Sequence, residues 1–244
     1  MAKVAMIYAA AGASRRFGGK VKKAFALMEN RPVFIRSIEL FINREDCCQH
    51  ILVVAPDDLE MVKSKYAANL MLMGVKAVAG GAERWESVAN GLREVSDEAE
   101  LVGVHDAVRV CVKPEWIDAV FAEAGKSGAA ILAAPITGTI KRVSGAKVVD
   151  ETVHREGLYE AQTPQVFRRE VIFEAYRRRA EVTGPITDDA QLVEAMGHPV
   201  TVVETDVSNL KITRPEDVRL ALAVVKSRPE KRAAARGPFE EAQW

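Results

Sequence analysis

The sequence predicts an α/β fold with a mainly parallel sheet and helices on both faces. Through the first half of the chain, short runs rich in β-branched and other apolar residues alternate with segments of helical periodicity. Such alternation is typical of strand–helix–strand units with parallel neighbouring strands. The 244 residues are 48% hydrophobic, which is enough for a substantial core. Sheets of this kind bind ligands at the carboxyl ends of their strands.

The predicted elements of the first half follow from these patterns. We expect strands at residues 4–8, 51–55, 75–78, 101–105 and 129–134, and helices at residues 33–43, 85–95 and 115–124.

The rhythm changes at about residues 137–155, where we expect a projecting hairpin arm. Two short apolar runs, 139–143 and 146–149, flank the turn residues Ser144 and Gly145. An arm with so little core of its own is marginal alone, so we expect it to pack on a second subunit of a homodimer. A surface flap is the alternative.

The sequence predicts a single domain of residues 1–227. Its last part consists of helical patterns at 170–179 and 187–196, a strand at 200–204 and a helix that begins at Pro215. Residues 228–244, rich in charge and alanine, are interpreted as a tail without chemistry.

Composition excludes several classes of protein. Lys plus Arg and Asp plus Glu both total 34, so net charge provides no general attraction to nucleic acid or to a membrane surface. No apolar run reaches the ~20 residues that span a bilayer. Only Cys47, Cys48 and Cys111 occur, which predicts no disulfide framework and favours a reducing cytoplasm.

The segment after the first strand predicts a phosphate-binding loop. Small residues at Ala10, Ala11 and Gly12 let backbone N–H groups approach an anion. The cations Arg15, Arg16, Lys20, Lys22 and Lys23 follow, with no acidic residue before Glu29. This concentration of charge favours a nucleoside triphosphate over a solvated basic turn, although the spacing of neither the common P-loop nor the dinucleotide motif occurs.

Two further segments carry candidate ligands. Asp106 follows a buried strand and is a candidate Mg²⁺ ligand, since Mg²⁺ typically takes one or two carboxylates plus substrate phosphates. Its alternative is a surface pair with Arg109. The double glycine Gly80-Gly81 precedes a predicted helix that contains Ser87, and this loop could contact a base edge or be an ordinary turn.

The remaining candidates are cationic or hydroxyl side chains suited to a second phosphate-bearing substrate: Arg155, Thr163 and Lys211. Each taken singly is equally a surface residue. The four histidines lack metal-ligand spacing and no nucleophilic triad is evident, which leaves phosphoryl chemistry as the prediction.

Taken together, the motifs resemble one family over roughly residues 3–225. They are Ala10-Ala11-Gly12-x-x-Arg15-Arg16-Phe17, Lys23, Gly80-Gly81-Ala82-Glu83-Arg84-x-x-Ser87, His105-Asp106-Ala107-x-Arg109, Arg155-x-Gly157-Leu158, Thr163-Pro164-Gln165-x-Phe167 and Lys211-Ile212-Thr213-Arg214-Pro215-Glu216-Asp217. In this order they resemble the 2-C-methyl-D-erythritol 4-phosphate cytidylyltransferase family.

The resemblance implies a Rossmann-like nucleotidyltransferase fold and transfer of CMP from CTP to methylerythritol 4-phosphate in non-mevalonate isoprenoid synthesis. It implies that Arg16 and Lys23 stabilise the transition state and that Asp106 holds Mg²⁺ or another divalent ion. Other implied positions contact CTP (Ala10, Ala11, Gly12, Gly81, Ala82, Ser87 and Ala107) or position the acceptor (Arg109, Thr139, Arg155, Thr163 and Lys211). Thr139 and Arg155 are implied to reach in from the partner's arm.

Departures from the family pattern spare these candidate catalytic residues. Ser14 replaces a common glycine, Lys22 a common proline and Ala82 a common aspartate; Val108, Val110 and His154 depart as well. Two alternatives to the implied function stay open at this point: a cytidylyltransferase for another polyol phosphate such as ribitol 5-phosphate, and a non-catalytic CTP-binding protein.

Overall fold

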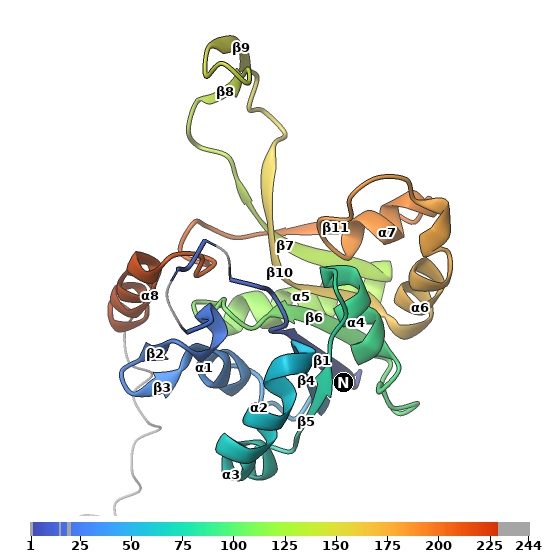
Figure 1. The fold of residues 1–244 in the computed structure, drawn as a ribbon. Helices are drawn as coiled ribbons and strands as arrows, with labels where there is room; N and C mark the ends of the chain where they lie inside the picture. Colours follow the sequence, from blue (N-terminus) through green and yellow to red (C-terminus); the bar gives the residue numbers. More distant parts are fainter. Residues whose placement is uncertain (1, 15, 19–20, 229–244) are drawn as a thin grey trace, which may run out of the picture.

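A seven-stranded sheet forms the centre of the computed structural model, which describes residues 2–14, 16–18 and 21–228 (Figure 1). Its strand order is β11-β7-β10-β6-β1-β4-β5. The strands are β1 (Val4–Ala9), β4 (Cys47–Val54), β5 (Val75–Ala79), β6 (Leu101–Asp106), β7 (Ala129–Pro135), β10 (Tyr159–Arg168) and β11 (Thr201–Glu204). Neighbours pair in parallel except for β10, which runs antiparallel to both β6 and β7. The predicted mainly parallel sheet is confirmed.

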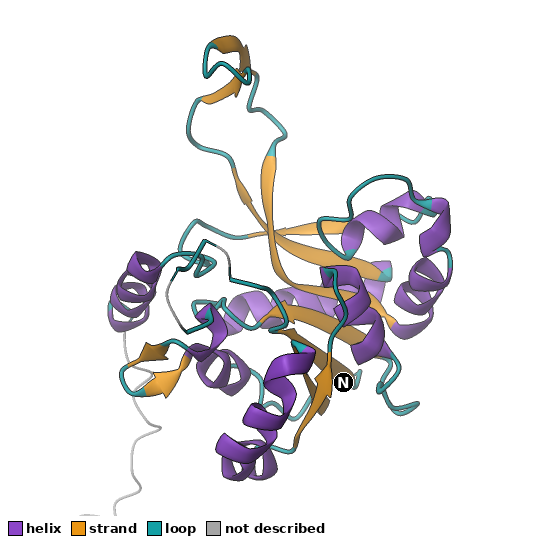
Figure 2. Ribbon diagram, in the orientation of Figure 1, coloured by secondary structure: helices purple, strands orange, loops and turns teal. Residues whose placement is uncertain are grey.

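Helices cover both faces of this sheet, as predicted (Figure 2). One face packs on α1 (Val33–Glu39), α2 (Leu59–Lys65), α3 (Ala67–Leu72), α5 (Pro114–Ser127) and α8 (Pro215–Lys226). The other packs on α4 (Arg84–Leu92), α6 (Arg169–Arg177) and α7 (Ala190–Ala195). None of the helices within the described ranges is long and apolar enough to cross a membrane.

The register of β1 brings two distant segments to one edge. Ala9, the last residue of β1, lies opposite Asp106, the last residue of β6. The chain proceeds from β1 to β4 and β5 on one side, then returns to β6 on the other, so this edge is a topological switch point. Nearby, the Ile212 N–H donates to the Val108 carbonyl at 3.0 Å and brings Lys211 to the same edge.

The hairpin projects from the body as predicted, but its second strand was misplaced (Figure 1). β8 (Ile140–Val143) pairs with β9 (Val149–Val153), which begins where the predicted strand 146–149 ends. The turn extends to Val148, whose carbonyl accepts from the Ser144 N–H, and Lys147 adopts a φ of 60°. Apolar character at Val148 suggested a strand, whereas the backbone there closes a turn.

The sequence analysis did not predict the central strand β10. Its residues Gln162, Thr163 and Gln165 are buried but polar, so the segment shows no apolar alternation. Each of these side chains has hydrogen-bond partners inside the protein. Helices α2 and α3 were missed as well, and α7 begins at Ala190 rather than at the predicted residue 187. A small hairpin of β2 (Leu27–Met28) and β3 (Arg31–Pro32) precedes α1.

Candidate functional site

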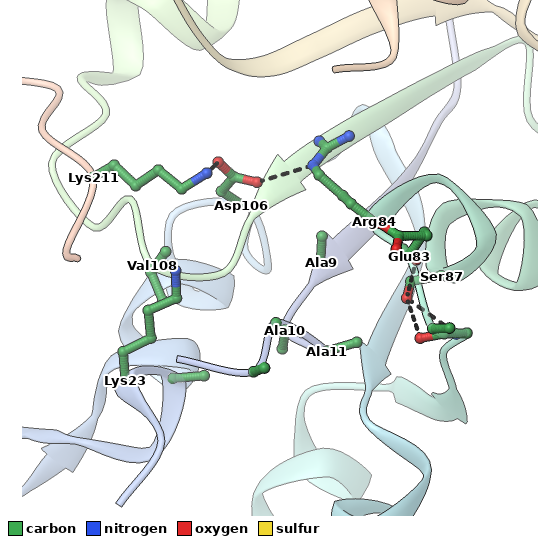
Figure 3. Close-up of a pocket in the computed structure, with 15 residues that line it drawn as sticks. Ala9, Ala10, Ala11, Lys23, Glu83, Arg84, Ser87, Asp106, Val108 and Lys211 are labelled. Atoms are coloured by element: carbon green, nitrogen blue, oxygen red, sulfur yellow. Dashed lines mark hydrogen bonds and ion pairs between the residues drawn. The ribbon is translucent and has the colours of Figure 1, made fainter. Parts of the chain in front are cut away.

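A pocket of about 190 Å³ opens at the carboxyl ends of β1 and β6 (Figure 3). Its wall brings together four segments that the sequence analysis singled out separately. The lining residues are Ala9, Ala10, Ala11, Gly12, Ala13, Lys23, Ala24, Gly81, Ala82, Glu83, Arg84, Ser87, Asp106, Val108 and Lys211. Small residues after β1 form one wall, and the beginning of α4 forms another.

The double glycine after β5 is required by close packing. A Cβ atom on Gly80 would lie 2.6 Å from Ser87 Oγ and 2.8 Å from Ala11 Cβ, and one on Gly81 would lie 2.4 Å from Glu86 Cβ. The Gly81 N–H donates to Ser87 Oγ at 3.1 Å. These contacts place the loop against the first strand's loop, so the two segments together form a narrow, small-residue surface suited to close approach by a ligand.

Cations converge on Asp106 from opposite sides of the pocket (Figure 3). Lys211 Nζ lies 2.6 Å from Asp106 Oδ2, and Arg84 Nε lies 3.6 Å from Oδ1. Arg109 is buried and does not line the pocket, and its Nε lies 3.8 Å from Oδ2. Burial alone would raise the pKa of Asp106, but Lys211, Arg84 and Arg109 outweigh it and hold that pKa well below its usual range. Asp106 is therefore ionised across the physiological pH range.

Lys23 completes the positive side of the pocket. Burial lowers the pKa of its ammonium group, and the nearby charges of Lys211 and Arg16 lower it further, while Asp106 opposes them. Several cations held together in a partly buried site repel one another, and an anion placed among them relieves that repulsion. The pocket is thus electrostatically matched to a polyphosphate.

Two side chains anchor the segment that carries Lys23. Ser14, with a φ of 54°, accepts the Lys23 N–H on its Oγ at 3.1 Å. Lys22 Nζ donates to Asp58 Oδ2 at 2.6 Å and so ties this segment to the turn before α2. Neither contact was predicted: Lys22 had been counted only as one of the loop's cations.

Thr163 and Arg109 belong to a buried network beneath Asp106. The Asp106 N–H donates to Thr163 Oγ1 at 3.0 Å, and His105 Nε2 lies 3.0 Å from the Arg109 carbonyl. A carbonyl only accepts, so Nε2 carries the hydrogen and His105 Nδ1 accepts from the Thr163 hydroxyl at 3.1 Å. Burial lowers the pKa of His105 to about 4, which keeps this arrangement neutral. The Thr163 hydroxyl is committed to His105 rather than turned into the pocket.

The arm carries the other candidate residues. Thr139 and Arg155 are exposed and line a shallow hollow of about 460 Å³ together with Thr152, Val153, His154 and Glu156. Arg155 donates to the Thr137 carbonyl within the arm. Figure 1 shows the β8–β9 hairpin standing well away from the sheet. Within one subunit, the arm residues and the pocket are separate.

The outcome for the predicted residues divides along these lines. The pocket wall contains Ala10, Ala11, Gly12, Lys23, Gly81, Ala82, Ser87, Asp106 and Lys211. Ala107 and Arg109 are buried next to this wall, and Arg16 is exposed near Lys23. The loop cations Arg15 and Lys20 lie outside the described residues. The prediction overlooked Arg84, although it stands inside the quoted Gly80 to Ser87 motif.

The donor set fits a hard divalent cation only in part. Among the described residues, no three His, Cys, Asp or Glu side chains cluster as a metal site. Asp106 nevertheless offers an ionised carboxylate inside a phosphate-sized, cationic pocket. Mg²⁺ commonly binds through one carboxylate, substrate phosphates and water, and this mode requires no preformed protein cage.

A mainly parallel sheet with a small-residue loop, converging cations and a carboxylate at its switch point defines a nucleotide-binding α/β protein of the nucleotidyltransferase kind. The family model for 2-C-methyl-D-erythritol 4-phosphate cytidylyltransferase matches residues 4–227. The chain belongs to this family.

Known relatives agree along nearly the whole length. A cytidylyltransferase of this name from Rhodopirellula baltica is 42% identical over 236 residues, covering 92% of this chain and 95% of the relative. The Alkaliphilus metalliredigens enzyme is 38% identical, covering 93% and 95%. The crystal structure of the Thermus thermophilus enzyme superimposes with a TM-score of 0.75 at 32% identity, covering 92% of this chain and 99% of that one.

Proposed function

We propose that this protein transfers CMP from CTP to 2-C-methyl-D-erythritol 4-phosphate, forming 4-diphosphocytidyl-2-C-methyl-D-erythritol and pyrophosphate in the non-mevalonate route to isoprenoids. The observation that carries the proposal is the convergence of Lys23, Lys211 and Asp106 on one small-residue pocket, in a chain of this family. Residues 1–227 act as a single catalytic domain. The reaction takes place in the cytoplasm, and the three free cysteines fit a reducing compartment.

In the proposed reaction, an oxygen of the acceptor phosphate attacks the α-phosphorus of CTP. A new P–O bond forms, the bond to the bridging oxygen of the β-phosphate breaks, and pyrophosphate leaves with that electron pair. The protein supplies alignment and charge rather than a covalent group. Lys23 and Arg16 neutralise charge that develops around the α-phosphate, while Ala10, Ala11 and Gly12 admit the triphosphate to close backbone contact.

In the proposed complex, residues of the opposite pocket wall contact the base and the ribose. Gly81, Ala82, Ser87 and Ala107 surround the cytidine, with the backbone of the glycine loop reading the base edge. Asp106 would hold Mg²⁺ or a similar divalent ion, which when bound supplies further neutralisation of the phosphates. Thr163 supports Asp106 by accepting its backbone N–H, and Arg109 supports it through the ion pair described above.

Acceptor binding requires two subunits in this proposal. Lys211 positions the acceptor phosphate from within the pocket, and Thr139 and Arg155 arrive from the arm of a homodimer partner. The distance of the arm from the body and its exposed apolar residues Val143, Val148 and Val149 support this arrangement. An arm of one small hairpin gains stability by packing on another chain.

Pyrophosphate release from CTP tests the proposal, with methylerythritol 4-phosphate and ribitol 5-phosphate as parallel acceptors and Mg²⁺ present. We expect turnover with methylerythritol 4-phosphate that falls on the order of 10²–10³-fold in Lys23→Ala, because a preorganised charge is lost from the transition state. Lys113→Ala is the matched control, since Lys113 pairs with Asp206 outside the pocket wall.

Turnover of ribitol 5-phosphate alone would contradict the acceptor assignment and leave the CTP site standing. Binding of CTP without release of pyrophosphate in the presence of either acceptor would contradict the catalytic proposal itself. Equal losses in Lys23→Ala and Lys113→Ala would contradict the role given to Lys23.

A further inference from the structure

An ion pair links the pocket to α7, a helix that contributes no residue to the pocket wall. Arg84 Nη2 lies 2.8 Å from Asp189 Oδ2. Its Nε lies 3.6 Å from Asp106 Oδ1 (Figure 3). Arg84 is the first residue of α4, and Asp189 immediately precedes α7. One guanidinium group therefore bridges two carboxylates, one at the end of β6 and the other just before α7.

The position of Asp189 is itself strongly constrained. Its side chain has no exposed surface, and its Oδ1 accepts the Tyr176 hydroxyl at 2.6 Å. The backbone N–H groups of Asp189 and Ala190 both donate to Gln165 Oε1 at 3.1 Å. Gln165 lies on β10, two residues after Thr163, whose hydroxyl holds the Asp106 backbone. Strand β10 therefore contacts Asp106 by two routes. Thr163 accepts the Asp106 N–H directly, and Gln165 holds the backbone of Asp189, whose carboxylate contacts Arg84 beside the Asp106 carboxylate.

The charges of this arrangement favour a role beyond structure. A half-buried arginine beside Asp106, with no other carboxylate as partner, would oppose a cation at Asp106, because like charges repel. Asp189 lies closer to the Arg84 guanidinium than Asp106 does, at 2.8 Å against 3.6 Å. The positive charge of Arg84 is therefore shared between two carboxylates. The planar fork of arginine contacts both carboxylates in one fixed geometry, which a lysine ammonium cannot reproduce.

We propose that Arg84 and Asp189 are positioning residues: Asp189 sets the orientation of Arg84, and Arg84 in turn sets the orientation and effective charge of Asp106 for Mg²⁺–CTP binding. The inference rests on the proposed transfer reaction for its kinetic consequences. Its key feature is that Asp189 is buried and absent from the pocket wall. The Asp189 side chain reaches the pocket wall directly through the 2.8 Å contact with Arg84.

The test compares Asp189→Asn with a matched variant, Asp46→Asn. Asp46 makes a bidentate pair with Arg44, at 2.9 and 2.7 Å, before the amino end of β4 and so at the opposite edge of the sheet. Two quantities are measured for each: the Kd of Mg²⁺–CTP by titration calorimetry without acceptor, and kcat with methylerythritol 4-phosphate. Thermal unfolding reports the structural cost of each substitution.

We expect Asp189→Asn to raise the Kd about tenfold and lower kcat about tenfold, while Asp46→Asn leaves both within about twofold of the wild type. In the Arg84→Met background, Asp189→Asn has no further effect, because the linking group is gone. Arg84→Lys recovers part of the loss caused by Arg84→Met, since it restores charge without the fork.

Values of Kd and kcat in Asp189→Asn that match those of Asp46→Asn overturn the inference. If Asp189→Asn does not fold, Arg84→Lys decides it, and wild-type Kd and kcat in that variant overturn the inference. A raised Kd alongside a wild type that turns over no acceptor upholds the inference and contradicts the proposed function. A wild type that does not bind Mg²⁺–CTP overturns both.

Discussion

The pocket and the arm hold their candidate residues in opposite ways. Asp106 has a side chain only 9% exposed and is fixed by Lys211, Arg84 and the Thr163 hydroxyl, all of the same chain. Arg155 is exposed on a hairpin that projects from the body, and its hydrogen bond is to Thr137 of the same arm. Under the proposed function, the fold of one chain would preorganise the nucleotide half of the site, whereas the acceptor half would depend on where a second chain places its arm.

The largest expected effect tests whether the two halves come from different subunits. Lys23→Ala and Arg155→Ala should each lower kcat/KM on the order of 10²–10³-fold, because each removes a charge aimed at a phosphate. When the two inactive variants are unfolded together and refolded, mixed dimers carry both changes in one site and neither in the other. Random mixing should then restore about a quarter of the wild-type rate.

The control is a mixture of Lys23→Ala with Lys211→Ala, two changes on the pocket wall of one chain. Those mixed dimers contain one altered residue in each site, so no activity should return. Failure of the Lys23→Ala and Arg155→Ala mixture to regain activity, despite demonstrated subunit exchange, would contradict the shared site.

The next effect concerns the apolar surface of the arm. Val149 is 54% exposed, and Val149→Lys should weaken a dimer formed through the arm by tenfold or more, since a charge would have to be buried. Sedimentation velocity over a concentration series measures this. The unfolding temperature of the body should change little, because the arm contributes little to its core.

Val202→Lys is the matched control, a 44% exposed valine on the edge strand β11. Equal dissociation of both variants would point to general charge repulsion, and dimers unaffected by Val149→Lys would place the interface elsewhere.

A smaller effect is expected from the Lys22–Asp58 contact, and it tests whether the pocket is preorganised. Lys22→Met removes the contact with Asp58 that anchors the Lys23 segment, and kcat should fall a few fold. Asp58→Asn should give a similar fall, and the double variant should be no worse than either alone. Steady-state kinetics with saturating CTP measures all three.

Additive losses in that double variant would show that Lys22 and Asp58 act independently, with Lys22 serving as a separate phosphate contact. The partly buried pair then would not be the anchor of the segment.

The smallest effect concerns the packed body rather than either half of the site. Burial lowers the pKa of His50 below its ordinary value of 6.5, and its Nδ1 lies 2.8 Å from the Tyr8 hydroxyl. As the pH falls through about 6.5, the unfolded chain takes up a proton that the folded protein resists, so stability is lost below that pH. In His50→Gln this part of the loss should disappear.

Urea unfolding at several pH values between about 5 and about 7.5 measures the change in slope. A variant with the wild-type pH dependence would contradict the assignment to His50, whatever its absolute stability.

Much of the fold could be predicted because the order of apolar and polar residues along the chain indicates most of the strands and helices. Strands β1 and β7 are continuous apolar runs, and β4 and β6 each contain one, at residues 51–54 and 101–104, as expected for strands buried on both faces. Strand β10 could not be found in the same way. Its buried glutamines and threonine satisfy their polar groups with partners far away in sequence, and no local period records those partners.

The candidate site divides in the same manner. Lys23 and Asp106 could be proposed from their placement after strands, because strand ends carry ligands in this class of sheet. Arg84 could not, since its significance depends on Asp189, which lies in a segment predicted only as a helix. Likewise, the Thr163 hydroxyl donates to His105, which lies fifty-eight positions away in the sequence, and this partner could not be predicted.

By itself, the sequence determined the kinds of elements, the position of the small-residue loop with its cations, and the family. These properties reside in residue type and short-range spacing. Only the tertiary structure decided that Asp106 lies between Lys211 and Arg84, and that Arg155 lines a hollow of the arm rather than the pocket. Register and topology decide such contacts, because they determine which distant segments meet, and the burial and charge of each side chain follow from that meeting.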